Sequence, residues 1–539
     1  MAGVWQLTKL ILRRDRIKLP AWILGVTGSL IAMVPLLKSV YNDDAELMTI
    51  YQAFGTNPAG LMLTGPMDAP TFGGMMMIET GLWWAMAVVF MNTLFIVRHT
   101  RQNEEMGAQE LLLSGRAHRA AGLVAALVVA FVMNLIVAVA VAIGLSSLEH
   151  SWSMESAWLY GITLGLFGFA WAAIASLISQ LAQTTRLANG ILAGLMGAAF
   201  LLRGIGDYLG AVDSAGLLQP AWQSLISPFG WLQATRALTF PDWQPLWALG
   251  LVSVMAICLA FLLLGRRDVG AGLLPVKAGH SHAGALLISP FGLTWKLQKN
   301  VFFGWFIGVF TMVATVGMLV PQMSNVYESN ENMLRMIAAM GGAGAIVPSF
   351  LSAMLSLVAL MVAAYALHAL SKLWNEESSG RLENLLACGT SRYNWLLKHF
   401  VVVTFGSLIM LTVAGWALAV FVNSNSAGYT ANVGEYIMAG ASYFPVVMLF
   451  ACLYVLLFGL LPRAASLTTW LYYGFVVFMT WLGPLLQLGS NITSFSVMEH
   501  IATPPASEVN WDALGVLLLV ALAMLTVGLL TWRQRNLQL

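Results

Sequence analysis

The sequence predicts an all-α polytopic membrane protein with 12 transmembrane helices, arranged as two parallel six-helix repeats. Its composition is 59% hydrophobic and only 9% charged, with a mean hydropathy of +0.78, whereas soluble chains carry about 25% charged residues. Apolar runs of about 18 residues recur, each long enough to cross a bilayer core of about 30 Å as a helix. A polar stretch also occurs twice, half a chain length apart. The short alternating segments of a transmembrane β-barrel do not dominate.

Residues 1 to about 19 are expected to form an amphipathic helix on the membrane surface. We place the spans of the first half near 20–37, 74–97, 120–144, 157–179, 187–205 and 245–264. Those of the second half lie near 303–321, 348–371, 399–422, 438–461, 466–488 and 513–532. The expected domains are therefore a first six-span half over 1–264, a cytoplasmic linker over 265–290 and a second half over 291–539.

The distribution of basic residues predicts the orientation. With both termini in the cytoplasm, 22 of the 26 Lys and Arg residues fall on cytoplasmic segments, as the positive-inside rule requires. The net charge of +2 does not indicate the strongly positive surface that nucleic-acid binding proteins carry. The three cysteines, Cys258, Cys388 and Cys452, lack the spacing of a zinc site or a disulfide framework. His280 and His282 are expected to be solvated, so no metal site is predicted.

The duplicated polar stretch follows the second span of each half. It contains the triplets Asn103-Glu104-Glu105 and Asn375-Glu376-Glu377, each followed by a Gly-x-x-Glu-x-Leu-Leu piece. The triplets lie 272 residues apart along the chain, whereas the Gly-x-x-Glu-x-Leu-Leu pieces lie 273 residues apart. A single inserted residue therefore reconciles the two copies. The copies hold six of the eight acidic residues predicted on the cytoplasmic side. We expect Gly107 and Gly380 to break the helix that continues each second span and to start a short lever helix. The alternative is an ordinary solvated loop with a capped helix.

The repeat also includes the start of each half. Arg13, Arg16 and Trp22 match Lys296, Lys299 and Trp305 at one constant separation along the chain. Each half is therefore expected to run as a basic surface helix, a span, a long outer loop, a second span, the lever and four more spans. Because six is even, both halves enter the membrane from the same side, which makes them parallel repeats.

With these features the chain resembles the fused, two-half permeases of ABC-2 type exporters. It is most similar to the tetronasin or polyketide-antibiotic multidrug exporter permeases, over essentially its whole length. The resemblance rests on the surface elbow helix, six spans per half and a Glu-Glu pair followed by Gly-x-x-Glu-x-Leu-Leu. It implies that this segment holds the coupling helix, which docks on the nucleotide-binding subunit. The implied coupling positions are Glu104, Glu105, Gly107, Glu110, Glu376, Glu377, Gly380, Arg381 and Glu383. The first copy departs from the second at Ala108, where the second has Arg381, so the two ATPase contacts are expected to be unequal.

The resemblance implies a permease of the bacterial cell membrane that extrudes hydrophobic or amphiphilic compounds, either antibiotic- and drug-like or lipid-like. The chain is expected not to be an enzyme and to hold no cofactor, because it contains neither a phosphate-binding loop nor any Gly-Lys dipeptide. ATP and Mg would be bound by a separate ABC ATPase, expected in two copies per permease.

Two other functions remain open at this point. One is a proton-coupled secondary multidrug transporter, which needs buried titratable groups such as Glu79 and His368. The other is a polytopic lipid-processing enzyme, for which Asp43-Asp44 is the only paired-acid candidate.

The substrate route is the least readable part of the sequence. Candidates on the predicted second and eleventh spans are Glu79, Trp83, Trp84, Phe90, Asn92, Tyr472, Tyr473 and Trp481. The alternatives are an interfacial acid for Glu79, and packing or membrane-belt roles for the aromatic residues. Asn134 and His368 are expected to be interhelical hydrogen-bond partners. Near the outer end we expect Trp222, Phe229 and Trp231 to form an apolar gate, with simple interface anchoring as the alternative.

Overall fold

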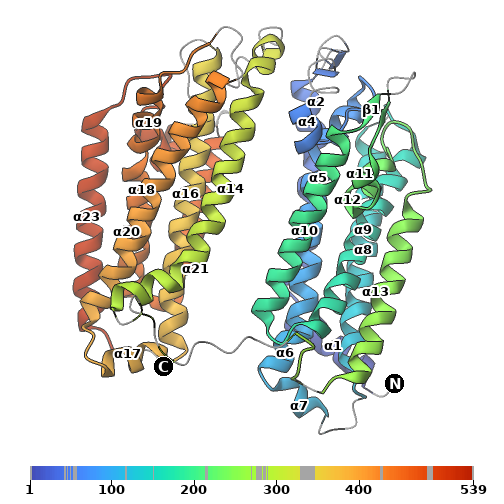
Figure 1. Cartoon of the computed structure of the whole chain (residues 1–539), viewed down its shortest axis with the longest axis horizontal. Coiled ribbons are helices and arrows are strands. Elements are labelled where there is room, and N and C mark those ends of the chain that lie inside the picture. The colour runs from blue at the N-terminus through green and yellow to red at the C-terminus, as the bar shows by residue number, and fades with distance from the viewer. Residues whose placement is uncertain are drawn as a thin grey trace. The chain divides into compact units, whose positions relative to one another are not determined.

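The computed structural model describes residues 3–41, 58–113, 118–149, 151–212, 217–268, 270–274, 289–327, 346–424, 429–481 and 490–536, with single residues between them. Asp43, His280 and much of the predicted linker lie outside these residues. The chain divides into two compact units, Met1–Gly279 and His280–Leu539 (Figure 1). Apart from one short hairpin, β1 (Ala211–Val212) with β2 (Leu218–Gln219), the regular structure of the described part is helical.

The helices of the first unit are α1 (Val4–Arg14), α2 (Lys18–Val40), α4 (Pro58–Leu63), α5 (Phe72–His99), α6 (Arg101–Glu105), α7 (Ala108–Leu113), α8 (Ala121–Leu148), α9 (Met154–Leu181), α10 (Thr185–Tyr208), α11 (Trp222–Leu225), α12 (Pro228–Ala234) and α13 (Leu246–Arg266). Those of the second unit are α14 (Pro290–Tyr327), α16 (Ile346–Ser378), α17 (Arg381–Ala387), α18 (Arg392–Ser424), α19 (Val433–Ser442), α20 (Phe444–Leu460), α21 (Pro462–Trp481), α22 (Ser490–Thr493), η2 (Val497–His500) and α23 (Trp511–Gln534).

Within the described residues, 11 helical stretches are long and apolar enough to cross a membrane. The predicted class, an all-α polytopic membrane protein, is therefore confirmed. The remaining predicted span, 466–488, falls on α21, which is helical but is not among the 11. Its first turns carry an arginine and several hydroxyl side chains, which lower the apolar character of the helix. Residues 482 and 484–488 of that span lie outside the described part.

Glycine lets the helices of the first unit pack closely. Helix α9 contacts α5, α8 and α13 and is the centre of that unit. A Cβ atom on Gly161 would lie 2.3 Å from the carbonyl oxygen of Ala138 on α8, so only glycine fits there. In the second unit α20 contacts α16 and α23, and Gly528 of α23 approaches the backbone of Leu456 in the same way. The last long helix therefore packs against the fourth long helix in both units: α13 against α9 in the first, and α23 against α20 in the second.

The start of each unit is built differently. In the first unit α1 and α2 are separate helices, and Asp15 lies in the turn between them. In the second unit Lys296 and Lys299 lie inside α14, which is helical without interruption. The side chain at the position matching Asp15, Gln298, donates to the carbonyl of Ala369 at 3.0 Å. The expected separate surface helix is therefore present only in the first unit.

Candidate coupling site

Each copy of the repeated polar stretch contains a glycine that ends one helix and starts another. Gly107 and Gly380 both have φ of +72°, a conformation that favours glycine because it has no Cβ. Each glycine donates its N–H to a glutamate carbonyl three residues earlier, Glu104 or Glu377, at 3.0 Å. The short helix that follows is α7 in the first unit and α17 in the second. The predicted break and short helix are thus present in both copies.

The glutamate three residues before Gly107 is buried in an ion pair. The side chain of Glu104 is only 4% exposed, and its carboxylate accepts hydrogen bonds from Arg267 at 2.5 and 2.8 Å. Arg267 caps the C-terminal end of α13, the last helix of this unit. A second guanidinium, that of Arg101, lies 2.9 Å from the same carboxylate and donates to the carbonyl of Ser179 on α9. The first polar stretch is therefore fixed to the ends of α9 and α13.

The second unit repeats this arrangement. The side chain of Glu377 is 1% exposed, and its two oxygens accept from the two terminal nitrogens of Arg535 at 2.8 and 2.6 Å. Arg535 caps the C-terminal end of α23. Such bidentate pairs are among the strongest hydrogen-bonded contacts in proteins. We call the pairs Glu104–Arg267 and Glu377–Arg535 the two latches.

The latches correct the alignment of the two copies. Matching the letters Asn-Glu-Glu pairs Glu104 with Glu376, but the buried carboxylates are Glu104 and Glu377, each three residues before its glycine. When the two buried glutamates are matched, no inserted residue is needed between the glutamate and the glycine. Sequence reasoning also missed Arg267 and Arg535. The available signal was an arginine three residues beyond the predicted last span of each half.

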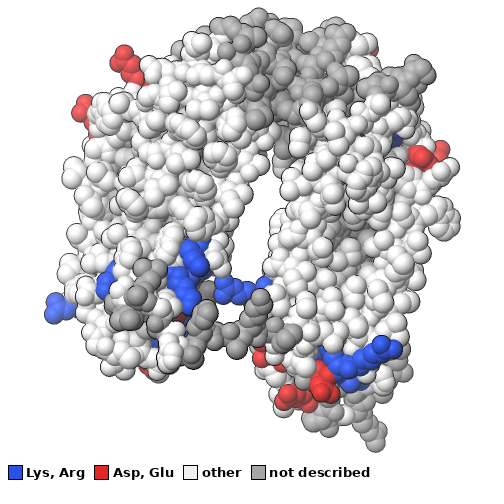
Figure 2. Space-filling view, in the orientation of Figure 1, with Lys and Arg blue, Asp and Glu red and all other residues white. Residues whose placement is uncertain are grey.

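The other acidic residues of the two copies lie closer to the surface. The Glu105 carboxylate accepts from the backbone N–H of Thr185, in the first turn of α10, at 2.8 Å. Arg381 pairs with Glu376 at 3.0 Å while remaining 59% exposed. Glu110 and Glu383, on the two short helices, are exposed. Lysine, arginine and acidic side chains gather at this end of each unit, whereas the rest of the visible surface is largely uncharged (Figure 2).

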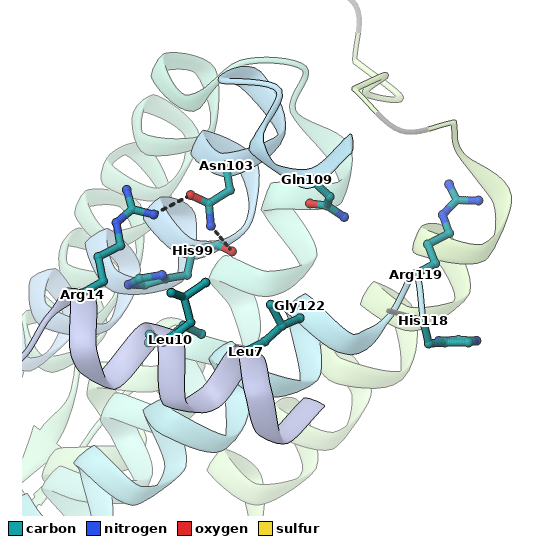
Figure 3. Close-up of a pocket in the computed structure, with 10 residues that line it drawn as sticks. Leu7, Leu10, Arg14, His99, Asn103, Gln109, His118, Arg119 and Gly122 are labelled. Carbon is teal, nitrogen blue, oxygen red and sulfur yellow. Dashed lines mark hydrogen bonds between the residues drawn. The ribbon is translucent and has the colours of Figure 1, made fainter. Parts of the chain in front are cut away.

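The N-terminal helix contacts the same end of the first unit. Arg14 at the end of α1 donates to the side chain of Asn103 on α6 at 2.8 Å, and Asn103 donates to the carbonyl of His99 at 3.2 Å (Figure 3). A small cavity of about 50 Å³ lies beside this contact. His118 and Arg119 line its far side, on the segment that leads into α8 (Figure 3). Asn103 stands where the second unit has Glu376, so the two copies also differ in this contact.

The predicted substrate-path residues do not converge on one surface. On α5, Trp83 and Phe90 are exposed, whereas Trp84 donates to the carbonyl of Val26 on α2 at 3.0 Å. Asn92 is fully buried and exchanges hydrogen bonds of 3.0 and 2.7 Å with Asn134, the interhelical bond expected for Asn134.

The remaining candidates lie elsewhere. Among the described residues the half-buried Glu79 has no side-chain hydrogen-bond or ion-pair partner. His368 accepts from the indole of Trp305 at 3.2 Å. On α21, Tyr472 and Tyr473 both contact the ring of Phe450, and Trp481 is half-buried.

The three predicted gate residues have three different surroundings. Phe229 is fully buried and contacts the rings of Phe167 and Phe200, with ring centroids 5.1 and 5.9 Å away. Trp231 is half-buried and donates to the carbonyl of Leu225 at 2.6 Å. Trp222 is exposed. Phe229 thus belongs to the core of the first unit, and only Trp222 presents a largely free aromatic surface.

Two comparisons with known proteins bear on these observations. Residues 287–533 match the family model described as the C-terminal domain of the multidrug efflux system permease Rv1217c. The chain is also similar to the multidrug efflux system permease protein Rv1217c of Mycobacterium tuberculosis (strain ATCC 25618 / H37Rv). The two are 28% identical over 537 residues, which cover 99% of this chain and 95% of that protein. The chain is thus similar to an efflux permease along almost its entire length.

Proposed function

We propose that the chain is the permease subunit of an ABC-2 type efflux system of the bacterial cell membrane. It extrudes hydrophobic or amphiphilic compounds, and a separate ABC ATPase, present in two copies, supplies the energy. The similarity to a multidrug efflux permease supports the transport role. The observation that carries the ATPase partnership is the latch. In both units a short surface helix follows the glycine break that comes three residues after a buried glutamate, and this glutamate is ion-paired to the end of the last long helix.

The latch gives a mechanical route from the surface into the membrane. An isolated buried carboxylate is costly, so Glu104 and Glu377 stay bound to their arginines when α7 or α17 is displaced. Pressure on α7 therefore reaches the end of α13 through Gly107 and Glu104, and pressure on α17 reaches the end of α23 through Gly380 and Glu377. Because α13 packs on α9 and α23 packs on α20, the displacement reaches the centre of each unit. The chain has no phosphate-binding loop of its own, so the pressure comes from the partner.

The exposed side chains of the short helices are the proposed contact with the partner. In the first unit these are Glu110 and the 78% exposed Leu111, and in the second they are Arg381 and Glu383. Arg381 has no counterpart in the first copy, where Ala108 stands. The two ATPase subunits therefore meet surfaces of different charge, and we expect them to bind with unequal strength.

Charge reversal of the exposed acids tests this proposal. The chain is co-expressed with the ABC ATPase encoded beside it, as wild type and as the double variant Glu110→Arg, Glu383→Arg. We expect the ATPase to co-purify with the wild type and to be lost from the double variant, because both acids face solvent and their reversal leaves each unit folded. Glu508→Arg, an exposed acid outside the two polar stretches, is the matched control. Export driven by a proton gradient from the chain alone would overturn the proposal.

A further inference from the structure

A cleft in the first unit lies beside the latch, at the same end of the helices. It has a volume of about 320 Å³, within the range of small-molecule sites, which is about 300–1,000 Å³. Its walls come from the starts of α2 and α10, the end of α5, and α6. The residues that matter here are Lys18, Trp22, Leu94, Arg98, Thr185 and Asn189.

The charges in the cleft leave one cation unpaired. Asp15 is buried, and its two oxygens lie 2.6 Å from the ring nitrogen of His99 and 3.1 Å from the guanidinium of Arg98. Asp15 therefore neutralises Arg98. In the described part of the chain the ammonium of Lys18 has neither an ion pair nor a hydrogen-bond partner. Among the residues that line the cleft, the positive charge of Lys18 is thus the one left for a ligand.

Uncharged hydrogen-bonding groups line the same cleft. The hydroxyl of Thr185 is buried and makes no hydrogen bond to any described residue. The amide side chains of Gln102 and Asn189 also line the cleft without a partner among the described residues. Buried polar groups normally find partners, so a polar group in the cleft would complete their bonding. Apolar side chains line the cleft as well, and among them Trp22 and Leu94 are exposed.

The ordinary reason for lysine and arginine at such a place is the positive-inside bias, which would act on both halves alike. The second half differs here. At the separation that matches Trp22 with Trp305, the counterparts of Asp15 and Lys18 are Gln298 and Val301. At the separation of the two glycines of the polar stretches, the counterpart of Arg98 is Ser371. The charged cleft is therefore a property of the first half, which favours a specific ligand over a general orientation signal.

We propose that this cleft binds an amphiphile with a single anionic group, such as a carboxylate, sulfate or phosphate. The anionic group pairs with the ammonium of Lys18 and accepts from Thr185 and Asn189, while the apolar part lies along Trp22 and Leu94. This proposal rests on the proposed function, because it names the chemical class that the permease takes up. The anion has two possible sources, a transported compound or an acidic phospholipid of the inner leaflet.

Photolabelling of the full chain in phosphatidylcholine nanodiscs tests the proposal without any ATPase. The probes are three C16 chains with a diazirine at the same carbon, ending in a carboxylate, a trimethylammonium or a glucoside. We expect saturable labelling of α2 and α5 by the carboxylate. Lys18→Gln should raise its half-saturating concentration about tenfold, as expected for loss of a hydrogen bond to a charged group, and should change the glucoside less than twofold. Lys18→Glu should shift the preference to the trimethylammonium probe.

Lys9→Gln is the matched control, because Lys9 lies over the ring of Trp5 on α1 and outside the cleft. Labelling that does not depend on the charge of the probe, or that Lys18→Gln leaves unchanged, would overturn the proposal.

Two further arms separate the sources of the anion. Displacement by phosphatidylglycerol without ATP-driven export of the carboxylate probe assigns the cleft to a lipid. Export that Lys18→Gln reduces assigns it to cargo. Charge-dependent labelling together with no export of any compound would contradict the proposed function while leaving the cleft standing.

Discussion

Removing the arginine of one latch should uncouple the permease without preventing its assembly with the ATPase. In Arg535→Met the carboxylate of Glu377, 1% exposed, loses hydrogen bonds of 2.8 and 2.6 Å at once. Both bonds come from the same guanidinium, so the variant removes both hydrogen bonds between Glu377 and Arg535. Breaking a buried pair from one side costs about 3–5 kcal/mol. We therefore expect the free energy of unfolding of the second unit to fall by about that amount.

In the first unit the carboxylate of Glu104 has a second guanidinium. In Arg267→Met it keeps Arg101 at 2.9 Å, so we expect a loss below that range, roughly 2 kcal/mol. Unfolding of the purified chain in detergent, followed by tryptophan fluorescence against denaturant, measures both losses.

The functional assay is dye export by proteoliposomes that contain the chain and its ATPase. Arg535→Met should retain the ATPase, because the exposed face of α17 is unchanged, yet export at least tenfold less dye per ATP hydrolysed. The swapped pair Glu377→Arg, Arg535→Glu restores the ion pair and should recover part of both stability and export. Arg533→Met, an exposed arginine two residues earlier, is the matched control. Wild-type export by Arg535→Met at normal ATPase content would refute the role of the latch.

Three further predictions address other parts of the chain. Asn92→Ala leaves the buried amide oxygen of Asn134 without its donor, while the amide nitrogen keeps the carbonyl of Ala130. The loss should destabilise the chain by about 1–3 kcal/mol in denaturant unfolding, and an unchanged midpoint would show that the pair is not buried as described. Gly380→Ala places a side chain on a residue with φ of +72°, and nothing lies within 4 Å of the added Cβ. The variant should therefore lose about 1–2 kcal/mol of stability through backbone strain alone. A loss no larger than that of Gly304→Ala, at a glycine inside α14, would contradict this. For Asp68, which precedes α5, burial raises the pKa from 3.8 to about 6 against the opposing effect of Arg236. The folded state therefore binds this proton more tightly than the unfolded state does. The resulting contribution to the free energy of unfolding is present below about pH 4 and is lost as the pH rises through about 6. Asp68→Asn should flatten the pH dependence of thermal unfolding between about pH 4 and pH 6, and an identical slope in the variant would refute it.

Much of the fold was predictable because its signals are long and periodic. A run of about 20 apolar residues has few alternatives to a membrane helix, and 11 of the 12 predicted spans match such helices. The breaks at Gly107 and Gly380 were also predictable, since positive φ favours glycine. The α21 segment fits less well because hydroxyl and basic residues dilute its apolar character. The uninterrupted α14 was missed because Lys296 and Lys299 repeat the basic pattern of the first copy, whereas Gln298 in place of Asp15 changes the local bonds.

The candidate site was predictable only in outline. Sequence comparison located both polar stretches, but it could not tell a buried carboxylate from an exposed one. Glu104 and Glu377 became distinct from Glu110 and Glu383 only through Arg267 and Arg535, which lie far away along the chain. Side-chain roles within a span were equally hidden: Trp83 and Trp84 are neighbours in sequence, yet one is exposed and the other bonds to α2. Packing partners, which single letters do not encode, decide these roles.

The most direct test of the central claim is export by purified components. Proteoliposomes would contain the chain alone or the chain with its ABC ATPase, loaded with a hydrophobic dye and supplied with ATP, a non-hydrolysable analogue or a proton gradient. The account predicts transport only with both proteins and hydrolysable ATP, with no requirement for a gradient. Transport by the chain alone on a proton gradient, undiminished without the ATPase, would contradict it.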